Sequence, residues 1–205
     1  VGIICLIGFL MGVIIAFETA LVAQIFGAVI FVVNGIGIAM TRELGPLMTA
    51  ILFAGRSGSA FAAQLGTQKV NEELNALTTF GLSPMYFLVV PRLIASSLVV
   101  PLLSVFATIL GILGGGLVMA MYDITYTQFY VQLLKSVTVT DIVFGLVKAV
   151  IFGFVIALIG CQCGMNTGAG AAAVGSSTTK SVVKSIIWIV VIDGAAALLT
   201  NRLGI

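Results

Sequence analysis

The chain has 205 residues, of which 60% are hydrophobic and only 8% charged, and its mean hydropathy is +1.27. Soluble domains carry about 25% charged residues, so this composition excludes an ordinary soluble domain and indicates a membrane protein. A net charge of +2 without a basic patch argues against nucleic-acid binding, and the absence of histidine removes the commonest general base and metal ligand, so we expect no catalytic residue, metal or cofactor in this chain.

The apolar runs predict five membrane-spanning helices, since one span needs about 20 mostly apolar residues. The first apolar block, residues 1–40, carries the single charge Glu18 and is long enough to cross twice. We therefore expect span one over residues 1–24, a turn at residues 24–28, and span two over residues 29–61. Polar or helix-breaking residues interrupt this second span at Arg42, Glu43, Pro46 and Arg56.

Residues 65–80 predict a short amphipathic helix outside the bilayer, because Val70, Leu74 and Leu77 recur at helical spacing between charged residues. Span three is predicted over residues 87–121. It is longer than the roughly 30 Å hydrocarbon layer requires, so we expect a tilt or a kink at Pro101.

Residues 122–140 predict a connecting segment that resembles an interfacial aromatic belt. Span four follows over residues 141–163, and Lys148 is expected to snorkel towards the membrane surface. Residues 166–177 are rich in Gly, Ala and Ser and predict a loop. The last span would be capped by Ser177 or Thr178, would contain the buried acid Asp193, and would end near residue 203.

Two residue types outside the charged positions invite a functional interpretation, but each favours a structural one. The three cysteines, Cys5, Cys161 and Cys163, lie in apolar stretches and predict buried, inert thiols. Glycines at four-residue spacing, Gly111 with Gly115 and Gly160 with Gly164, predict close helix packing. A slight excess of cations places the loop between Arg56 and Arg92 and the Lys180 and Lys184 region in the cytoplasm.

The strongest functional signal is the charged pair Arg42 and Glu43 inside span two, because a charge at the bilayer centre costs about 3 kcal/mol. An interfacial position or pairing elsewhere in the bundle is the alternative. Pro46 removes a backbone donor and widens the helix locally, which is tolerated beside a cavity or a packed neighbour. The sequence therefore predicts a cavity near residues 42–47.

Several long motifs, in order, resemble the MlaE/YrbE permease family, the membrane subunits of ABC transporters that work with MCE-domain proteins. The motifs are Arg42-Glu43-Leu44-Gly45-Pro46, residues 54–60, residues 65–77, Pro91-Arg92 and residues 177–183. One departure is Gln64, at a position where the family commonly has an acid.

The resemblance implies one MlaE-type permease domain over residues 1–205, with an all-α integral membrane fold of five transmembrane helices, a cytoplasmic coupling helix at 65–80 and a periplasmic segment at 122–140. The family's N-terminal interfacial helix would lie before Val1. The implied function is phospholipid transport between the inner (cytoplasmic) membrane of a bacterium and a periplasmic MCE-domain hexamer, for outer-membrane lipid homeostasis. Implied partners are a second copy of the chain, a cytoplasmic ATPase pair that holds ATP and Mg²⁺, and in some systems a STAS-domain protein.

The resemblance also implies two sets of site residues. The lipid-binding cavity would be formed at Arg42, Glu43, Leu44 and Leu47. Our own hypothesis is that Arg42 attracts or orients an anionic headgroup while Glu43 orients Arg42. The contact with the ATPase would be made by Lys69, Val70, Glu72, Glu73 and Leu74.

Two other functions compete with this interpretation. A proton-coupled secondary carrier would use the intramembrane charges Glu18, Arg42 and Asp193, although the internal repeat common in such carriers is not evident. A membrane anchor that only assembles its partners would not need charges at Arg42 and Glu43.

Overall fold

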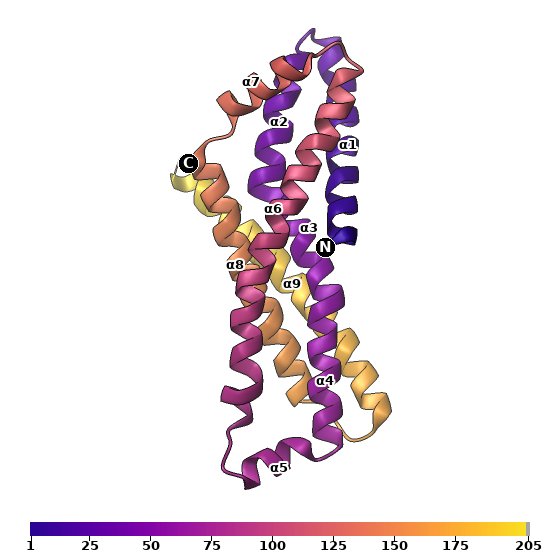
Figure 1. Ribbon diagram of the computed structural model, residues 1–205, viewed down its shortest axis with the longest axis vertical. Helices are drawn as coiled ribbons and strands as arrows, with labels where there is room; N and C mark the ends of the chain where they lie inside the picture. Colours follow the sequence, from indigo (N-terminus) through magenta and orange to yellow (C-terminus); the bar gives the residue numbers. More distant parts are fainter. Residues whose placement is uncertain (204–205) are drawn as a thin grey trace. The chain divides into compact units, whose positions relative to one another are not determined.

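The computed structural model describes residues 1–203, and Figure 1 shows these residues as a set of helices joined by short connections. Five segments are long and apolar enough to cross a membrane, which confirms the all-α membrane fold and the number of spans. They are Gly2–Ile25, Val29–Val70, Met85–Ala120, Val139–Met165 and Ala171–Thr200.

The first two spans meet at the predicted turn. The first is α1 (Gly2–Ile25), and Gly27 follows it with a φ of 63°, a left-handed conformation that glycine adopts without strain. The second span continues to Val70, nine residues beyond the predicted end at residue 61, because no proline or turn dipeptide interrupts residues 62–70. It is a continuous helical run of η1 (Val29–Phe31), α2 (Val32–Ile38), η2 (Ala39–Leu44), α3 (Gly45–Phe53), η3 (Ala54–Gly58) and α4 (Ser59–Val70).

The predicted amphipathic helix over residues 65–80 is wrong in its bounds. Residues 65–70 belong to α4, the chain turns at residues 71 and 72, and the short helix α5 (Glu73–Thr79) follows. Glu72 has a φ of 62°, a left-handed conformation that no α-helix continues through. α5 is still amphipathic, since Leu74 is buried while Glu72 and Glu73 are exposed.

The third span consists of η4 (Met85–Val89) and α6 (Val90–Ala120), and Pro101 lies inside α6. The connecting segment predicted over residues 122–140 contains a helix of its own, α7 (Tyr126–Ser136). A reciprocal capping box between Thr125 and Gln128 begins it: each side chain accepts a hydrogen bond from the backbone of the other residue.

The last two spans are α8 (Val139–Met165) and α9 (Ala171–Leu203). The loop predicted over residues 166–177 is confirmed for residues 166–170 and wrong beyond them, because three alanines after Gly170 favour helix and α9 begins at Ala171. Ser177 therefore does not cap the helix; it is buried inside α9 and accepts a 2.9 Å hydrogen bond from Thr167 Oγ1. Cys161 and Cys163 are buried as predicted, whereas Cys5 is only half-buried.

The chain divides into two compact units. Unit 1 contains Val1–Thr49 and Pro101–Lys148, and unit 2 contains Ala50–Val100 and Ala149–Ile205. The chain passes from one unit to the other within α3, α6 and α8. The core of unit 1 comes from α1, α2, the end of α6 and α7, with Ala16, Ala20, Val32, Val33, Ile36, Met40, Val118, Met119, Ile124 and Phe129.

Small residues allow helices to approach closely within each unit. In unit 1, a side chain at Gly12 of α1 would overlap the backbone of Gly111 in α6. In unit 2, a Cβ at Gly164 of α8 would lie 2.7 Å from the Cβ of Leu65 in α4. The prediction that the spaced glycines serve helix packing is confirmed, because these contacts leave no room for a larger side chain.

Candidate functional site

The predicted functional segment lies in η2, the part of the second span that forms π turns. The π turns of η2 end at Leu44, two residues before Pro46. A proline ring collides with the carbonyl four residues earlier and offers no N–H, so a regular α-helix cannot pass through it undisturbed. π turns shift the hydrogen-bond spacing to five residues and accommodate the ring. The same arrangement recurs in η4, which ends two residues before Pro91. The predicted local widening at Pro46 is confirmed.

Arg42 forms an ion pair with Asp141, which lies in the first turn of α8. Arg42 Nη1 donates to Asp141 Oδ1 at 3.4 Å, and the two side chains are 18% and 11% exposed. Thr138 holds the other carboxylate oxygen, Asp141 Oδ2, with its backbone N–H at 3.0 Å and its hydroxyl at 2.6 Å. These bonds are those of a helix N-terminal capping box, so the start of α8 fixes the carboxylate that faces Arg42.

Glu43 forms a second ion pair, with Lys148 of α8. The lysine side chain is only 2% exposed, whereas Glu43 is 33% exposed. The ring of Phe144 lies between the two pairs: its centroid is 5.2 Å from Arg42 Cζ and 5.7 Å from Lys148 Nζ. We call Arg42, Glu43, Asp141 and Lys148 the charge quartet. Its formal charges sum to zero, which lowers the cost of placing four charges in membrane-spanning helices.

Sequence reasoning missed half of this quartet. The prediction that Lys148 snorkels to the membrane surface is wrong, because its ammonium group is buried against Glu43. The hypothesis that Glu43 orients Arg42 did not foresee that Asp141 pairs with Arg42 and Lys148 with Glu43. A signal was present: Asp141 and Lys148 are seven residues apart, which is two helical turns on one face. Along the chain, span two presents a cation and then an anion, and α8 presents an anion and then a cation, so each residue of one helix meets a residue of opposite charge on the other.

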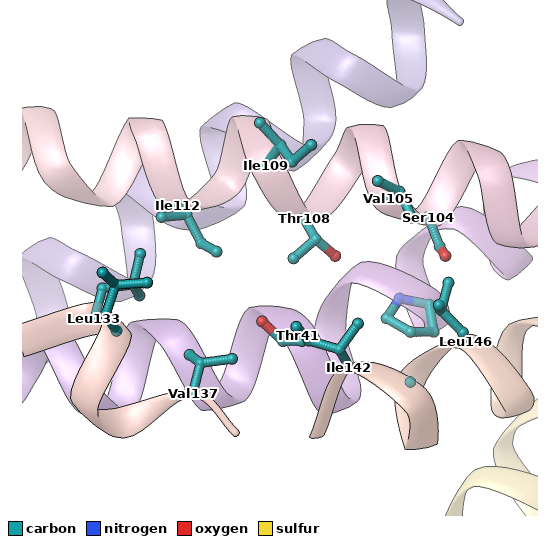
Figure 2. Close-up of a pocket in the computed structure, with 13 residues that line it drawn as sticks. Thr41, Ser104, Val105, Thr108, Ile109, Ile112, Leu133, Val137, Ile142 and Leu146 are labelled. Atoms are coloured by element: carbon teal, nitrogen blue, oxygen red, sulfur yellow. The ribbon is translucent and has the colours of Figure 1, made fainter. Parts of the chain in front are cut away.

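A cavity of about 310 Å³ lies in unit 1 next to the quartet. Figure 2 shows Ser104, Thr108 and Ile112 of α6 pointing towards residues from η2, α7 and α8. The cavity wall is almost entirely hydrocarbon, with three hydroxyl groups, and is formed by Thr41, Pro46, Ser104, Val105, Thr108, Ile109, Ile112, Leu133, Leu134, Val137, Ile142, Gly145 and Leu146. Ile109 is 51% exposed and Leu134 62% exposed, so the cavity opens to the surface of the unit.

The cavity stands where the sequence predicted one, but other residues line it. Thr41 and Pro46 form its wall, whereas Arg42, Glu43, Leu44 and Leu47 are not among the lining residues. Thr41 and Pro46 are five residues apart, which is about one π turn, so their side chains lie on the same face of the helix. The residues between them point to other sides of the helix. Leu44 packs against the core of unit 1 instead.

Comparison with known proteins decides the family. The family described as Permease MlaE matches residues 1–199. The chain belongs to the MlaE permease family. A probable ABC transporter permease protein of Synechocystis is 40% identical over 165 residues, covering 80% of this chain and 63% of that protein. A second, from Rickettsia typhi, is 35% identical over 185 residues and covers 89% of this chain and 71% of the relative.

The Arabidopsis thaliana protein TRIGALACTOSYLDIACYLGLYCEROL 1, chloroplastic, is 38% identical over 159 residues, 77% of this chain and 45% of its own length. The chain thus spans less than two thirds of the cyanobacterial relative and under half of the plant relative. As an MlaE-family ABC transporter permease, it is a multi-pass membrane protein.

The structure places the five predicted coupling residues of this MlaE-family permease on both sides of the turn after α4. Lys69 and Val70 end α4, and Lys69 Nζ donates at 2.7 Å to Met165 O at the end of α8. Glu72 and Glu73 are exposed at the start of α5, while Leu74 is buried beneath them. The exposed acids are therefore available to a partner, whereas Lys69 already ties two helix ends of unit 2 together.

The charges invoked for a secondary carrier lie on different helical elements of this permease. Glu18 is exposed on α1 in unit 1, and Asp193 is half-buried on α9 in unit 2. Residues 1–203 hold no group of three or more His, Cys, Asp or Glu side chains that could bind a metal ion. Membership of an ABC permease family favours the transporter interpretation over the carrier.

Proposed function

We propose that this permease moves phospholipids between a bacterial inner membrane and a periplasmic MCE-domain hexamer, in support of outer-membrane lipid homeostasis. Two copies of the chain would form the transport path. A cytoplasmic pair of ABC ATPases, with or without a STAS-domain protein, would supply ATP hydrolysis with Mg²⁺.

The observation that carries this proposal is the apolar cavity of about 310 Å³ beside the charge quartet. Its volume lies at the lower end of the roughly 300–1,000 Å³ of ligand pockets. Exposing a 16-carbon acyl chain to water costs about 13 kcal/mol at about 0.8 kcal/mol per methylene, so a lipid path must hide its tails. Hydrocarbon walls with few hydroxyl groups suit an acyl chain and give a sugar or an ion few partners.

The quartet supplies the polar end of such a site. Arg42 retains 18% side-chain exposure, and its planar guanidinium carries five N–H donors. A lipid phosphate that approached Arg42 would accept from this planar group, while Asp141 and Phe144 hold it in place. The name of the Arabidopsis relative contains that of a diacylglycerol bearing three galactose units, which supports a lipid with two acyl chains as the class of substrate.

Coupling to the ATPase is assigned to α5 and the turn before it. Exposed acids on a short amphipathic helix steer the docking of a complementary surface more than they strengthen it. Reversing both charges, with Glu72→Lys and Glu73→Lys, should slow association with the ATPase and abolish lipid-stimulated ATP hydrolysis. Unchanged association and stimulation would place the coupling surface elsewhere.

The lipid assignment is tested by filling the cavity. Ile109→Trp adds a bulky ring to its wall, and Leu113→Trp places the same ring one turn along α6, at an exposed position outside the lining set. The purified complex is assayed for bound phospholipid and for lipid transfer to the MCE protein. We expect Ile109→Trp to lose both and Leu113→Trp to keep both. Equal behaviour of the two variants would contradict the assignment of this cavity.

A further inference from the structure

Unit 2 contains a cation without a carboxylate partner. Arg92 is the third residue of α6, and its Nη2 donates to the neutral amide oxygen of Gln64 at 3.3 Å. Its guanidinium carbon lies 5.8 Å from the ring centroid of Phe61. Within residues 1–203 the ion pairs join Arg42 to Asp141 and Lys148 to Glu43, and none involves Arg92. The guanidinium is held in position by neutral groups while its charge stays uncompensated.

Arg92 borders a cavity of about 360 Å³ whose wall is completed by Ala63, Gln64, Thr67 and Gln68 of α4. Two buried polar atoms of these residues have no hydrogen-bond partner: Nη1 of Arg92, which is a donor, and Oε1 of Gln68, which is an acceptor. Leaving such atoms unpaired costs about 1–3 kcal/mol each. The wall thus combines a fixed cation with amide and hydroxyl groups and contains no acid, which is the chemistry of an anion site.

The position of Arg92 along α6 identifies the depth of this cavity in the membrane. No charged residue follows until Asp123, and the next two turns of α6 present exposed apolar side chains, Ile94 at 57% and Leu98 at 64%. Before Arg92, Tyr86 is 78% exposed, as expected for an aromatic residue at the membrane surface. Arg92 therefore lies where the acyl-facing surface of α6 begins, at the level of lipid phosphates.

We propose that Arg92, Gln64, Thr67 and Gln68 bind the phosphate of one phospholipid headgroup, in the leaflet on the side of the membrane where α5 lies. The planar guanidinium and the amide N–H groups of Gln64 and Gln68 donate to the phosphate oxygens. Gln68 Oε1 and Thr67 Oγ1 accept from headgroup hydroxyl groups, since the Thr67 hydroxyl already donates to Ala63 O. The acyl chains lie along the exposed side chains of Ala95 and Val99, which share the Arg92 side of α6. None of these residues lines the cavity of unit 1. The site is therefore separate from the transport path proposed above and does not rest on that function.

The test measures the phospholipid that stays bound to the chain after release from phosphatidylglycerol nanodiscs, by native mass spectrometry. Arg92→Gln should lower the lipid occupancy about tenfold or more. Arg92→Lys keeps the charge but lacks the forked N–H donors of the guanidinium, so its lipid occupancy should lie between that of Arg92→Gln and that of the unmodified chain. Lys180→Gln is the matched control, because it also removes one cation from unit 2, at a position outside the Arg92 cavity, and should leave occupancy unchanged.

A third variant leaves Arg92 in place. Gln64→Glu supplies the guanidinium with an internal carboxylate at the position of the present 3.3 Å contact, so it should lower lipid occupancy without removing the arginine. A retained thermal unfolding midpoint confirms that this variant is folded. The same variants are also measured in the Ile109→Trp background, where the unit 1 cavity is filled. The lipid that remains should still depend on Arg92, which separates this site from the proposed transport cavity.

Three results would overturn the proposal. Equal occupancy in Arg92→Gln and Lys180→Gln would show that Arg92 does not hold the lipid. Displacement of the lipid by excess inorganic phosphate would assign the site to free phosphate. Loss of a co-purifying protein partner in Arg92→Gln, with lipid retained, would assign it to an acidic segment of that partner.

Discussion

The two units of this permease treat intramembrane charge in opposite ways. In unit 1, two cations and two anions from η2 and α8 pair with each other around Phe144, and their charges cancel. In unit 2, Arg92 lies against an aromatic ring and a neutral amide, and no acid lines its cavity. The comparison suggests two uses of a cation in a spanning helix. A cation paired with an acid of the protein is neutralised internally, whereas a cation that contacts only neutral groups is open to an anion from outside the protein.

Within the charge quartet, the two members of an ion pair also differ in how far their side chains are exposed. In the quartet, the buried member is the Lys148 cation, at 2% exposure, while its partner Glu43 reaches the surface at 33%. The unfolding free energy lost when an ion pair is broken therefore depends on whether the buried or the exposed member is left without its partner.

Glu43→Gln should be the most damaging of the charge-removing substitutions. It removes the carboxylate that pairs with the buried Lys148 ammonium group, and removing one partner of a buried ion pair costs about 3 kcal/mol or more. Lys148→Met leaves the more exposed Glu43, which water can solvate, so it should cost less. Chemical or thermal unfolding in one detergent measures both. The double variant Glu43→Gln/Lys148→Met should recover much of the loss, and failure to recover it would mean that the pair is not the cause.

Asp141→Ala should destabilise unit 1 by about 2 kcal/mol, more than Arg42→Ala. Asp141 both pairs with Arg42 and accepts the Thr138 hydrogen bonds that begin α8, and loss of a helix cap costs about 1 kcal/mol in addition to the ion pair. Arg42→Ala removes only the pair and the contact with Phe144. Comparing the two unfolding free energies measures the cap, and equal values would show that the Thr138 bonds contribute nothing.

Much of the fold was predictable from the sequence because bilayer thickness fixes the length of apolar runs. The spans and the turn at Gly27 followed directly from this constraint. Element boundaries failed where composition misled: Gly, Ala and Ser near residue 171 suggested a loop, yet alanine has the highest helix propensity of all residues and α9 begins there. The break at Glu72 was also missed, because its left-handed conformation leaves no mark in the apolar periodicity.

The candidate site was predictable only in part, for a similar reason. Arg42, Glu43 and Pro46 stand out within one apolar span, so the segment and a nearby cavity could be inferred. The partners Asp141 and Lys148 lie about 100 residues away, and pairing across that separation depends on how α8 packs rather than on local pattern. Arg92 drew attention as part of a family motif and as the end of a predicted cytoplasmic loop, but not as a binding residue, since its significance lies in the absence of an acid around it.

Gln64→Glu tests the contrast between the units with the smallest expected effect, a stabilisation of about 0.5–1 kcal/mol. The substitution converts the neutral contact of Arg92 into an ion pair at a partly exposed position, where such pairs contribute up to about 1 kcal/mol. In detergent without phospholipid, the unfolding midpoint should rise. With saturating phosphatidylglycerol, the difference in unfolding midpoint between Gln64→Glu and the unmodified chain should vanish. The bound lipid stabilises the unmodified chain, whereas the new carboxylate excludes the lipid from the variant. The control Gln162→Glu adds an acid at another exposed glutamine of unit 2 that does not line the Arg92 cavity, and should show no lipid-dependent change. A midpoint that rises equally with and without lipid would mean that Arg92 needs only an internal partner, and the two units would then differ in sequence but not in their use of charge.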